Sequence, residues 1–280
     1  MPQPVYDLVF HDSRVQSESP AQPAGWSGGH APAIGADAWP RSKRTGFPMS
    51  HLLTLELPPE YRRKGPELVG IALFQADDHA AEPTPGAEQA LTEGAAPSNA
   101  AFFASLLRAH ASRHPQQVDL VDIIDGNFAL IWLRAEEISG PRTAPPADDR
   151  ASANVGDPGQ NMNAWDHPEP EIAISLALRA FDPNAGKAPV ETRRRVPDEG
   201  EYVDSAAYVD VTVSNDETLR AFYAEHHGRS HLGGTCFPVQ AMPEGLTPWF
   251  LELEDGVAEA NFGGGTMQLD LESGTFGWAC

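Results

Sequence analysis

A group of histidines and one cysteine in residues 226–236 is the part of the sequence most suited to metal chemistry. His226, His227 and His231 lie close together, and Cys236 follows five residues later. Imidazole and thiolate groups are good zinc ligands, and a turn at the intervening glycines would bring His227, His231 and Cys236 together. The spacing matches no strong zinc pattern, and histidines at a helix C-terminus are also favoured by the helix dipole. A metal or small-ligand site, or an enzyme built on it, is therefore the alternative hypothesis.

Other features of the sequence do not favour an enzyme. Cys236 lies among Gly, Thr, Phe and Pro, as expected of a small buried side chain. The glycines at 263–265 lack the Lys-Ser/Thr of a phosphate-binding loop, and a strand is expected after them rather than a helix. We expect no catalytic residues and no cofactor.

Carboxylates dominate the chain after Arg229, where seven acidic residues and no Lys or Arg occur. Side chains alternate along a strand, so Glu252 and Glu254 share one face of a predicted strand, and Asp270 and Glu272 share one face of the next. Such rows are typical of a solvated sheet face, and they also fit a docking surface for a basic protein. The candidate partner-binding residues are Glu252, Glu254, Asp255, Glu259, Asp270 and Glu272.

The charge of the whole chain points the same way. Its 280 residues include 19 basic and 40 acidic ones, which gives a net charge of −21. Binding to nucleic acid requires clustered Lys and Arg, and an anionic membrane would repel this chain. We therefore expect neither partner, and a cationic or basic one instead.

Targeting and redox signals are weak. The first residues, Met1–Asp7, have neither a basic nor an apolar region typical of a signal peptide, and no apolar run approaches the length of a membrane helix. The two cysteines are too few for a disulfide framework. These features predict a soluble, cytoplasmic protein with reduced thiols.

Strand patterns outnumber helix patterns. Residues 51–57 alternate as a strand with one solvated face, and residues 118–133 predict a hairpin that turns tightly at Asp125-Gly126. Other predicted strands are 69–75, 171–181, 202–213, 249–254 and 265–272. One helix is expected after Ser98, and a second from Ser214 to about Gly228 with Glu217 completing a capping box. The fold class is α+β with β dominant.

An internal echo predicts two related halves. Near the start, Gly28-Gly29 precedes Leu55-Glu56-Leu57 and an apolar run from Gly70. Near the end, Gly233-Gly234 precedes Leu251-Glu252-Leu253 and a strand from Gly265. We predict two pseudo-repeated antiparallel sheet units with a few packed helices. Their bounds are residues 1–138 and 171–280, joined by a linker or long surface loop at 139–170. One compact domain overall is the alternative.

Both ends of the chain also resemble the YwqG-like family, whose function is unknown. The first signature is Gly28-Gly29-His30-Ala31-Pro32, then Ala38-Trp39-Pro40-Arg41 and Gly46-Phe47-Pro48-Met49. The closing one is His231-Leu232-Gly233-Gly234, Phe237-Pro238-Val239-Gln240 and Asn261-Phe262-Gly263-Gly264-Gly265. The resemblance implies a β-rich fold with pseudo-repeated halves, and some bacterial members are suspected of being toxin-immunity proteins.

These observations give one functional hypothesis. We expect a non-enzymatic acidic binding protein, an immunity-type inhibitor that binds and blocks a cognate basic toxin or effector, for example a nuclease.

Overall fold

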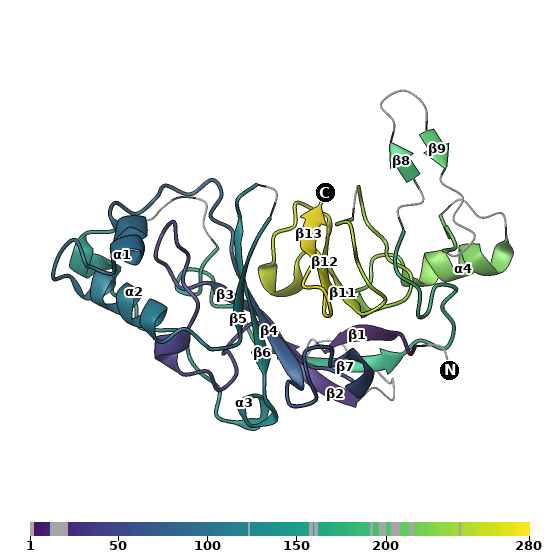
Figure 1. Ribbon diagram of the computed structural model, residues 1–280, viewed down its shortest axis with the longest axis horizontal. Helices are drawn as coiled ribbons and strands as arrows, with labels where there is room; N and C mark the ends of the chain where they lie inside the picture. Colours follow the sequence, from purple (N-terminus) through teal and green to yellow (C-terminus); the bar gives the residue numbers. More distant parts are fainter. Residues whose placement is uncertain are drawn as a thin grey trace.

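The computed structural model describes residues 3–11, 22–122, 124–156, 159, 162–190, 193–195, 200–202, 208–212, 216–240 and 242–280. In this part of the chain, eleven strands form one antiparallel sheet, two more form a separate hairpin, and four α-helices are present. The expected β-dominant α+β class is confirmed at this level. Figure 1 shows α1 and α2 at one end of the molecule and α4 at the other.

The strands of the large sheet come from both ends of the chain. They are β1 (Tyr6–His11), β2 (Gln22–Ser27), β3 (Ser50–Glu56), β4 (Gly70–Ala76), β5 (Gln117–Val121), β6 (Asn127–Leu133), β7 (Ile172–Leu178), β10 (His231–Leu232), β11 (Phe250–Glu254), β12 (Thr266–Asp270) and β13 (Phe276–Ala279). The separate hairpin pairs β8 (Arg193–Arg195) with β9 (Gly200–Tyr202). The helices are α1 (Ala87–Glu93), α2 (Ala101–Ala111), α3 (Ala135–Ser139) and α4 (Glu217–His226), with 3-10 turns at Ala36–Ala38, Pro59–Tyr61, Arg150–Ala153 and Val257–Glu259.

The strand order interleaves the two predicted halves. It runs β13-β12-β11-β10-β1-β7-β2-β3-β4-β6-β5, so β1 pairs with β10 and β7 pairs with β2. The two regions that the sequence assigns to separate units therefore share one continuous sheet. Their boundaries remain a prediction.

The two ends of this sheet approach each other. The Trp278 indole, on the edge strand β13, donates a 2.6 Å hydrogen bond to Asp122 in the loop between β5 and β6. Nearby, the rings of Phe128 and Phe276 lie 4.8 Å apart. These contacts curl the sheet around an apolar interior and nearly close it.

Both faces of the central strands are buried. Along β6, Phe128, Leu130 and Trp132 join the large interior core, whereas Ala129 and Ile131 join a second core on the opposite face. This alternation follows from the two-residue period of a strand. Apolar segments before β3 and after α3 cover the second face.

One expectation for the strand at residues 51–57 is wrong. In β3 every side chain except Glu56 is buried, so neither face is solvated. The polar residues find partners inside: His51 Nδ1 lies 2.8 Å from the Gly28 carbonyl, and Nε2 lies 2.9 Å from the Thr54 hydroxyl. The alternation of apolar and polar residues identified the two faces of β3. It wrongly predicted a solvated face, because the polar residues His51 and Thr54 are paired with each other inside the protein.

The predicted hairpin at 118–133 is present as β5 and β6, with a longer turn than expected. Pairing ends at Val121 opposite Asn127. Asp125 has a positive φ of 65°, whereas Gly126 does not, so this is not a two-residue primed turn. Instead, the Asp122 carboxylate accepts the Ile124 and Gly126 N–H groups at 2.9 and 2.8 Å.

Both predicted helices exist, with caps other than those expected. α2 begins at Ala101, and the distant Ser152 hydroxyl accepts the Phe102 N–H at 2.9 Å. α4 begins at Glu217 behind Asp216, whose carboxylate accepts the Thr218 N–H at 2.7 Å. Ser214, the expected cap, lies outside the described residues.

The remaining strand predictions divide. Those at 69–75, 171–181, 249–254 and 265–272 correspond to β4, β7, β11 and β12. Of the strand expected over 202–213, only Tyr202 is in a strand, residues 208–212 are irregular, and the rest lie outside the described residues. No helix in the described part of the chain is long and apolar enough to cross a membrane.

Candidate functional site

The six carboxylates predicted as a docking surface do not share one environment. The side chains of Glu252 and Asp270 have 0% exposure, so the expectation that these two face outward is wrong. Glu252 and Glu254 both lie in β11, as predicted, whereas Glu272 follows the end of β12. Cys236 and Phe237 cover Glu252, and Thr247 covers Asp270. Neither Glu252 nor Asp270 is available to a docking partner.

Glu252 joins three strands and a loop from inside the protein. Its Oε1 accepts the Phe237 N–H at 3.0 Å, and its Oε2 accepts the Cys236 thiol at 2.9 Å and the Gln268 amide at 3.0 Å. His231 Nδ1 on β10 lies 3.7 Å from Oε1. A buried carboxylate is tolerated only with such partners, and removing it would leave their N–H groups unpaired.

Asp270 and Asp255 each organise a turn. Asp270 accepts hydrogen bonds from Thr247 on one oxygen and from the Glu272 and Ser273 N–H groups on the other. Asp255 is exposed, yet it accepts the Phe262 N–H and, at 3.2 Å, the Gly264 N–H. Both carboxylates therefore stabilise turns in the glycine-rich C-terminal part of the chain by accepting backbone N–H groups.

Glu272 lies apart from the other exposed carboxylates. Its carboxylate forms an ion pair with Arg63, and its backbone carbonyl accepts a 2.8 Å hydrogen bond from Lys64. The charge of Glu272 is therefore balanced by residues from the N-terminal half.

Glu254 is half-buried and Glu259 is exposed, and a third residue, Glu169, lies beside Glu259. Burial, followed by the charges of Glu252 and Asp255, raises the pKa of Glu254 to about 7. The pKa of Glu169 is raised by burial and by Glu259, whose carboxylate lies within hydrogen-bonding reach. We call Glu169, Glu254, Asp255 and Glu259 the acidic rim.

The acidic rim lacks cationic side chains. In the described residues, no Lys or Arg forms an ion pair with any of its four carboxylates; the nearest partner is His167, whose Nδ1 lies 3.5 Å from Glu259 Oε2. Several exposed carboxylates elsewhere, namely Asp148, Asp166 and Glu171, have an arginine partner, whereas the rim has none among the described residues, so its negative charge is unbalanced. Its repulsion is relieved only by protons or by an external cation.

The histidine and cysteine cluster is part of the core. The ring nitrogens of His231 lie 3.0 Å from the Arg229 carbonyl and 2.8 Å from the Thr235 carbonyl. The Cys236 thiol donates to Glu252, and burial, then the Glu252 charge, raise the pKa of that thiol well above its ordinary value. The His227 ring packs 5.9 Å from Phe237 at the end of α4.

These contacts bear on the metal hypothesis. The described residues contain no group of three or more His, Cys, Asp or Glu side chains placed to hold a metal ion. The lone pairs and protons that His231 and Cys236 would use for a metal are engaged with the protein. The structure therefore gives His227, His231 and Cys236 a packing role.

A buried ionic cluster escaped the sequence reasoning. Arg179, which follows β7, donates to Asp7 on β1 at 3.1 Å and to Asp182 at 2.6 Å, and its side chain is 1% exposed. Asp182 also accepts the Thr235 N–H and hydroxyl at 3.1 and 2.9 Å. A Cβ on Gly234 would lie 2.5 Å from Asp182 Oδ2, so this glycine is required by close approach. Asp7, Arg179 and Thr235 are far apart in the sequence, so no local sequence pattern predicts this cluster.

A serine pattern also proves structural. Gly25-Trp26-Ser27-Gly28-Gly29 matches the Gly-x-Ser-x-Gly form of a nucleophile elbow. However, Ser27 ends β2, its side chain is 1% exposed, and two left-handed glycines follow instead of a helix. The strand–turn–helix context that exposes a catalytic serine is missing from this segment.

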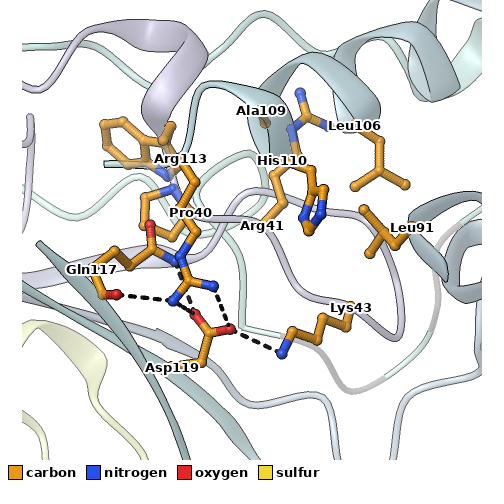
Figure 2. Close-up of a pocket in the computed structure, with 11 residues that line it drawn as sticks. Pro40, Arg41, Lys43, Leu91, Leu106, Ala109, His110, Arg113, Gln117 and Asp119 are labelled. Atoms are coloured by element: carbon orange, nitrogen blue, oxygen red, sulfur yellow. Dashed lines mark hydrogen bonds and ion pairs between the residues drawn. The ribbon is translucent and has the colours of Figure 1, made fainter. Parts of the chain in front are cut away.

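A surface pocket beside the end of α2 is lined by the basic residues Arg41, Lys43 and Arg113 (Figure 2). There Arg113 and Lys43 both contact Asp119, at 3.1 and 2.9 Å. Burial alone would raise the pKa of Asp119, but hydrogen bonds from Lys43 and Gln117 outweigh it and lower that pKa. Because Lys43 and Arg113 are both paired with the Asp119 carboxylate, their charges are already partly neutralised, and neither offers a free cation to an anionic ligand.

No protein-family model, curated protein or solved structure matches this chain.

Proposed function

We propose that this chain is a non-enzymatic acidic binding protein whose acidic rim docks onto a basic protein. The observation that carries the proposal is the acidic rim itself. Glu169 lies beside Glu259, Glu254 lies beside Asp255, and no Lys or Arg among the described residues forms an ion pair with any of the four. Complementary charge speeds encounter and fixes register between partners. A basic surface would supply the cations that the rim lacks.

The backbone of the rim supports this proposal. Ala258 and Glu259 both have positive φ values, 49° and 56°, although neither is glycine. The left-handed conformation costs a residue with a Cβ on the order of 1–2 kcal/mol, and such strain tends to concentrate at functional sites. Here it holds Glu259 toward Glu169, where the two negative charges repel each other.

In mechanism, we infer an inhibitor of the immunity type. The acidic surface covers a basic active-site cleft of a toxin, such as that of a nuclease, and excludes the nucleic-acid substrate. An interface of this kind buries on the order of 1,600 Å² and weakens as salt screens the charges. The immunity role rests on the resemblance of the two terminal signatures to the YwqG-like family, which is itself part of the proposal.

We also propose that the two halves are a duplicated unit. Two series of four antiparallel strands, β7-β2-β3-β4 and β1-β10-β11-β12, meet at the pairing of β1 with β7. From there they extend toward opposite edges of the sheet. In the first series, Ser27 pairs with Leu53, and the Gly28 N–H donates to the Leu52 carbonyl. In the second, Leu232 pairs with Leu251, and the Gly233 N–H donates to the Phe250 carbonyl.

The same correspondence holds at the centre of the sheet. Ser27 lies opposite Ile172 on β7, and Leu232 lies opposite Tyr6 on β1. Under this proposal Tyr6 corresponds to Ile172, so β1 and β7 are equivalent strands of the two units.

This register refines the echo in the sequence. It places Leu53-Thr54-Leu55, instead of Leu55-Glu56-Leu57, in correspondence with Leu251-Glu252-Leu253. Thr54 and Glu252 then occupy equivalent buried positions, each with polar partners.

The docking proposal is tested by comparing two charge variants in affinity capture. The rim variant carries Glu169→Gln, Glu254→Gln and Glu259→Gln; the control carries Glu82→Gln, Glu88→Gln and Glu136→Gln, which are exposed carboxylates elsewhere. Both variants remove three carboxyl groups, and the comparison is made at about pH 8, above the pKa of Glu254, so that they remove nearly the same charge. We expect a basic protein from the native host to be retained by wild type and control but lost by the rim variant. Equal retention by all three would contradict the proposal.

A further inference from the structure

A small cavity opens beside the acidic rim, and nothing described so far uses it. Its volume is about 140 Å³. Its walls are built from four separate segments of the chain and combine apolar with polar groups. The lining residues are Gly29, His30, Ser50, His51, Pro145, Ala164, His167, Pro168 and Glu169.

The Ser50 hydroxyl is an unpaired polar group in this cavity. Ser50 is 4% exposed, and its Oγ has no hydrogen-bond partner in the structure. A buried hydroxyl without a partner costs about 1–3 kcal/mol, so most such groups are paired. Ser50 lines the cavity, and its Oγ is shielded in the rotamer present. Rotation about the Cα–Cβ bond would turn this oxygen toward a bound molecule that supplies the missing hydrogen bond.

His51 contributes an uncharged wall to the cavity. Its Nδ1 contacts the Gly28 carbonyl, which can only accept, so Nδ1 carries the proton and Nε2 accepts from the Thr54 hydroxyl. Burial lowers the pKa of His51 to about 4, so the ring stays neutral at physiological pH. The ring therefore does not repel a cation.

The charged group in the wall is a carboxylate. Glu169 lines the cavity and lies beside Glu259, which itself lies 3.5 Å from His167 Nδ1. Two adjacent carboxylates favour a positive charge between or beside them. Pro145, Ala164 and Pro168 supply apolar surface next to this charge.

We propose that this cavity binds a primary alkylammonium group. The ammonium supplies N–H donors to the Ser50 hydroxyl oxygen and the Glu169 carboxylate, while the carbon chain contacts the two prolines and Ala164. An anionic ligand would face Glu169 and Glu259, and a purely apolar one would leave Ser50 unpaired.

The size of the cavity agrees with such a ligand. A cavity of about 150 Å³ accommodates a benzene-sized molecule of six heavy atoms. A lysine side chain beyond Cα, or n-butylamine, has five. A larger polyamine or aromatic amine would extend beyond the cavity toward the rim.

The alkylammonium group has two potential sources, a free amine or a lysine side chain of a protein. The lysine source rests on the proposed function, because it places one residue of the basic partner in the cavity. The free-amine source is independent of it. Binding of the amine and binding of the partner are therefore measured separately.

The test is a titration of the full-length protein followed by amide NMR. The probes are n-butylammonium, the neutral isostere n-butanol, the anion butyrate, and Nα-acetyl-lysine methylamide as a model of the lysine side chain. We expect saturable shifts at Gly29 and His30 with butylammonium, and at least about tenfold weaker binding of butanol and butyrate. Binding of the lysine model as well assigns the cavity to a protein side chain; binding of butylammonium alone assigns it to a free amine.

Two variants separate the cavity from general attraction to an acidic surface. Ser50→Ala and Glu169→Gln should each weaken butylammonium binding about tenfold, whereas the exposed-site control Glu88→Gln should leave it unchanged. Ser50→Ala should not lower the melting temperature, because the hydroxyl that it removes is unpaired.

The inference is overturned if butylammonium gives no saturable shift at the cavity, or if Glu88→Gln weakens binding as much as Glu169→Gln. Failure of this titration together with loss of the partner in the rim variant would remove the cavity site and leave the docking proposal intact. If the protein binds the amine but all variants retain the basic partner equally, the docking proposal is wrong and the cavity site stands.

Discussion

At the scale of single residues, Glu254 is a carboxyl group that ionises near neutral pH in the folded protein. Burial and the neighbouring charges of Glu252 and Asp255 raise its pKa from 4.5 to about 7. The folded chain therefore holds this proton where the unfolded chain has released it. Between these two pKa values, the contribution of Glu254 to stability falls as pH rises, and above about 7 the loss is complete.

This pH dependence predicts that Glu254→Gln stabilises the protein selectively at higher pH. At about pH 5 the variant should unfold at nearly the same urea concentration as wild type, and at about pH 8 at a higher one. Glu88→Gln, on the exposed side of α1, should show no such divergence. A constant difference between wild type and Glu254→Gln across this pH range would contradict the assignment.

The two cysteines should differ in reactivity. Cys236 is buried with a thiol whose pKa is raised by burial and by Glu252, whereas Cys280 is exposed. Because the thiolate is the reactive form, an aromatic disulfide reagent should modify Cys280 in the native protein and Cys236 only after denaturation. Modification of both at similar rates in the native state would show that the loop containing Cys236 opens readily.

At the scale of elements, Glu252 connects β10, β11 and β12 with the loop at 235–237. Glu252→Ala removes the acceptor of the Phe237 N–H, the Cys236 thiol and the Gln268 amide at once. We expect a loss of unfolding free energy of about 2–4 kcal/mol, because buried donors are left unpaired. The matched change Glu272→Ala removes only a partly exposed ion pair with Arg63 and should cost below about 1 kcal/mol. Equal costs in a urea titration would refute the division of the acidic residues into buried and exposed sets.

The strands illustrate what a sequence pattern determines. Alternation identified which side chains share a face in β3, β11 and β12, because the strand period is fixed by backbone geometry. It did not determine whether a face is solvated, since that depends on which distant segment covers it. Glu252 and Asp270 were therefore assigned to the correct face and to the wrong environment.

Caps and turns show the same limit. The apolar stripe of α2 predicted the helix, but the N–H group of its second residue, Phe102, is accepted by Ser152, fifty residues further along the chain. Likewise, Glu254, Asp255 and Glu259 follow from local composition, whereas Glu169 joins them only through tertiary folding. The unpaired Ser50 hydroxyl could not be predicted from the sequence, because the absence of a hydrogen-bond partner depends on which distant segments surround it.

At the scale of the whole molecule, the fold brings together segments that the sequence separates. β1 and β7 each pair with a strand from the other half, and Trp278 on one sheet edge reaches the loop beside the other. This curled sheet buries two of the six predicted docking residues, Glu252 and Asp270, and brings Glu259 beside Glu169 from a distant segment. The net charge of −21 attracts a basic protein at long range, and the acidic rim is the surface on which we propose that it docks.

The most direct test of this account is the equilibrium affinity of the purified basic partner for three proteins at low and moderate salt. These are wild type, the rim variant with Glu169→Gln, Glu254→Gln and Glu259→Gln, and the control variant with Glu82→Gln, Glu88→Gln and Glu136→Gln. The account predicts that the rim variant binds at least about tenfold more weakly at low salt, with a shallower salt dependence, and that the control binds like wild type. Identical affinities of the rim and control variants would contradict it.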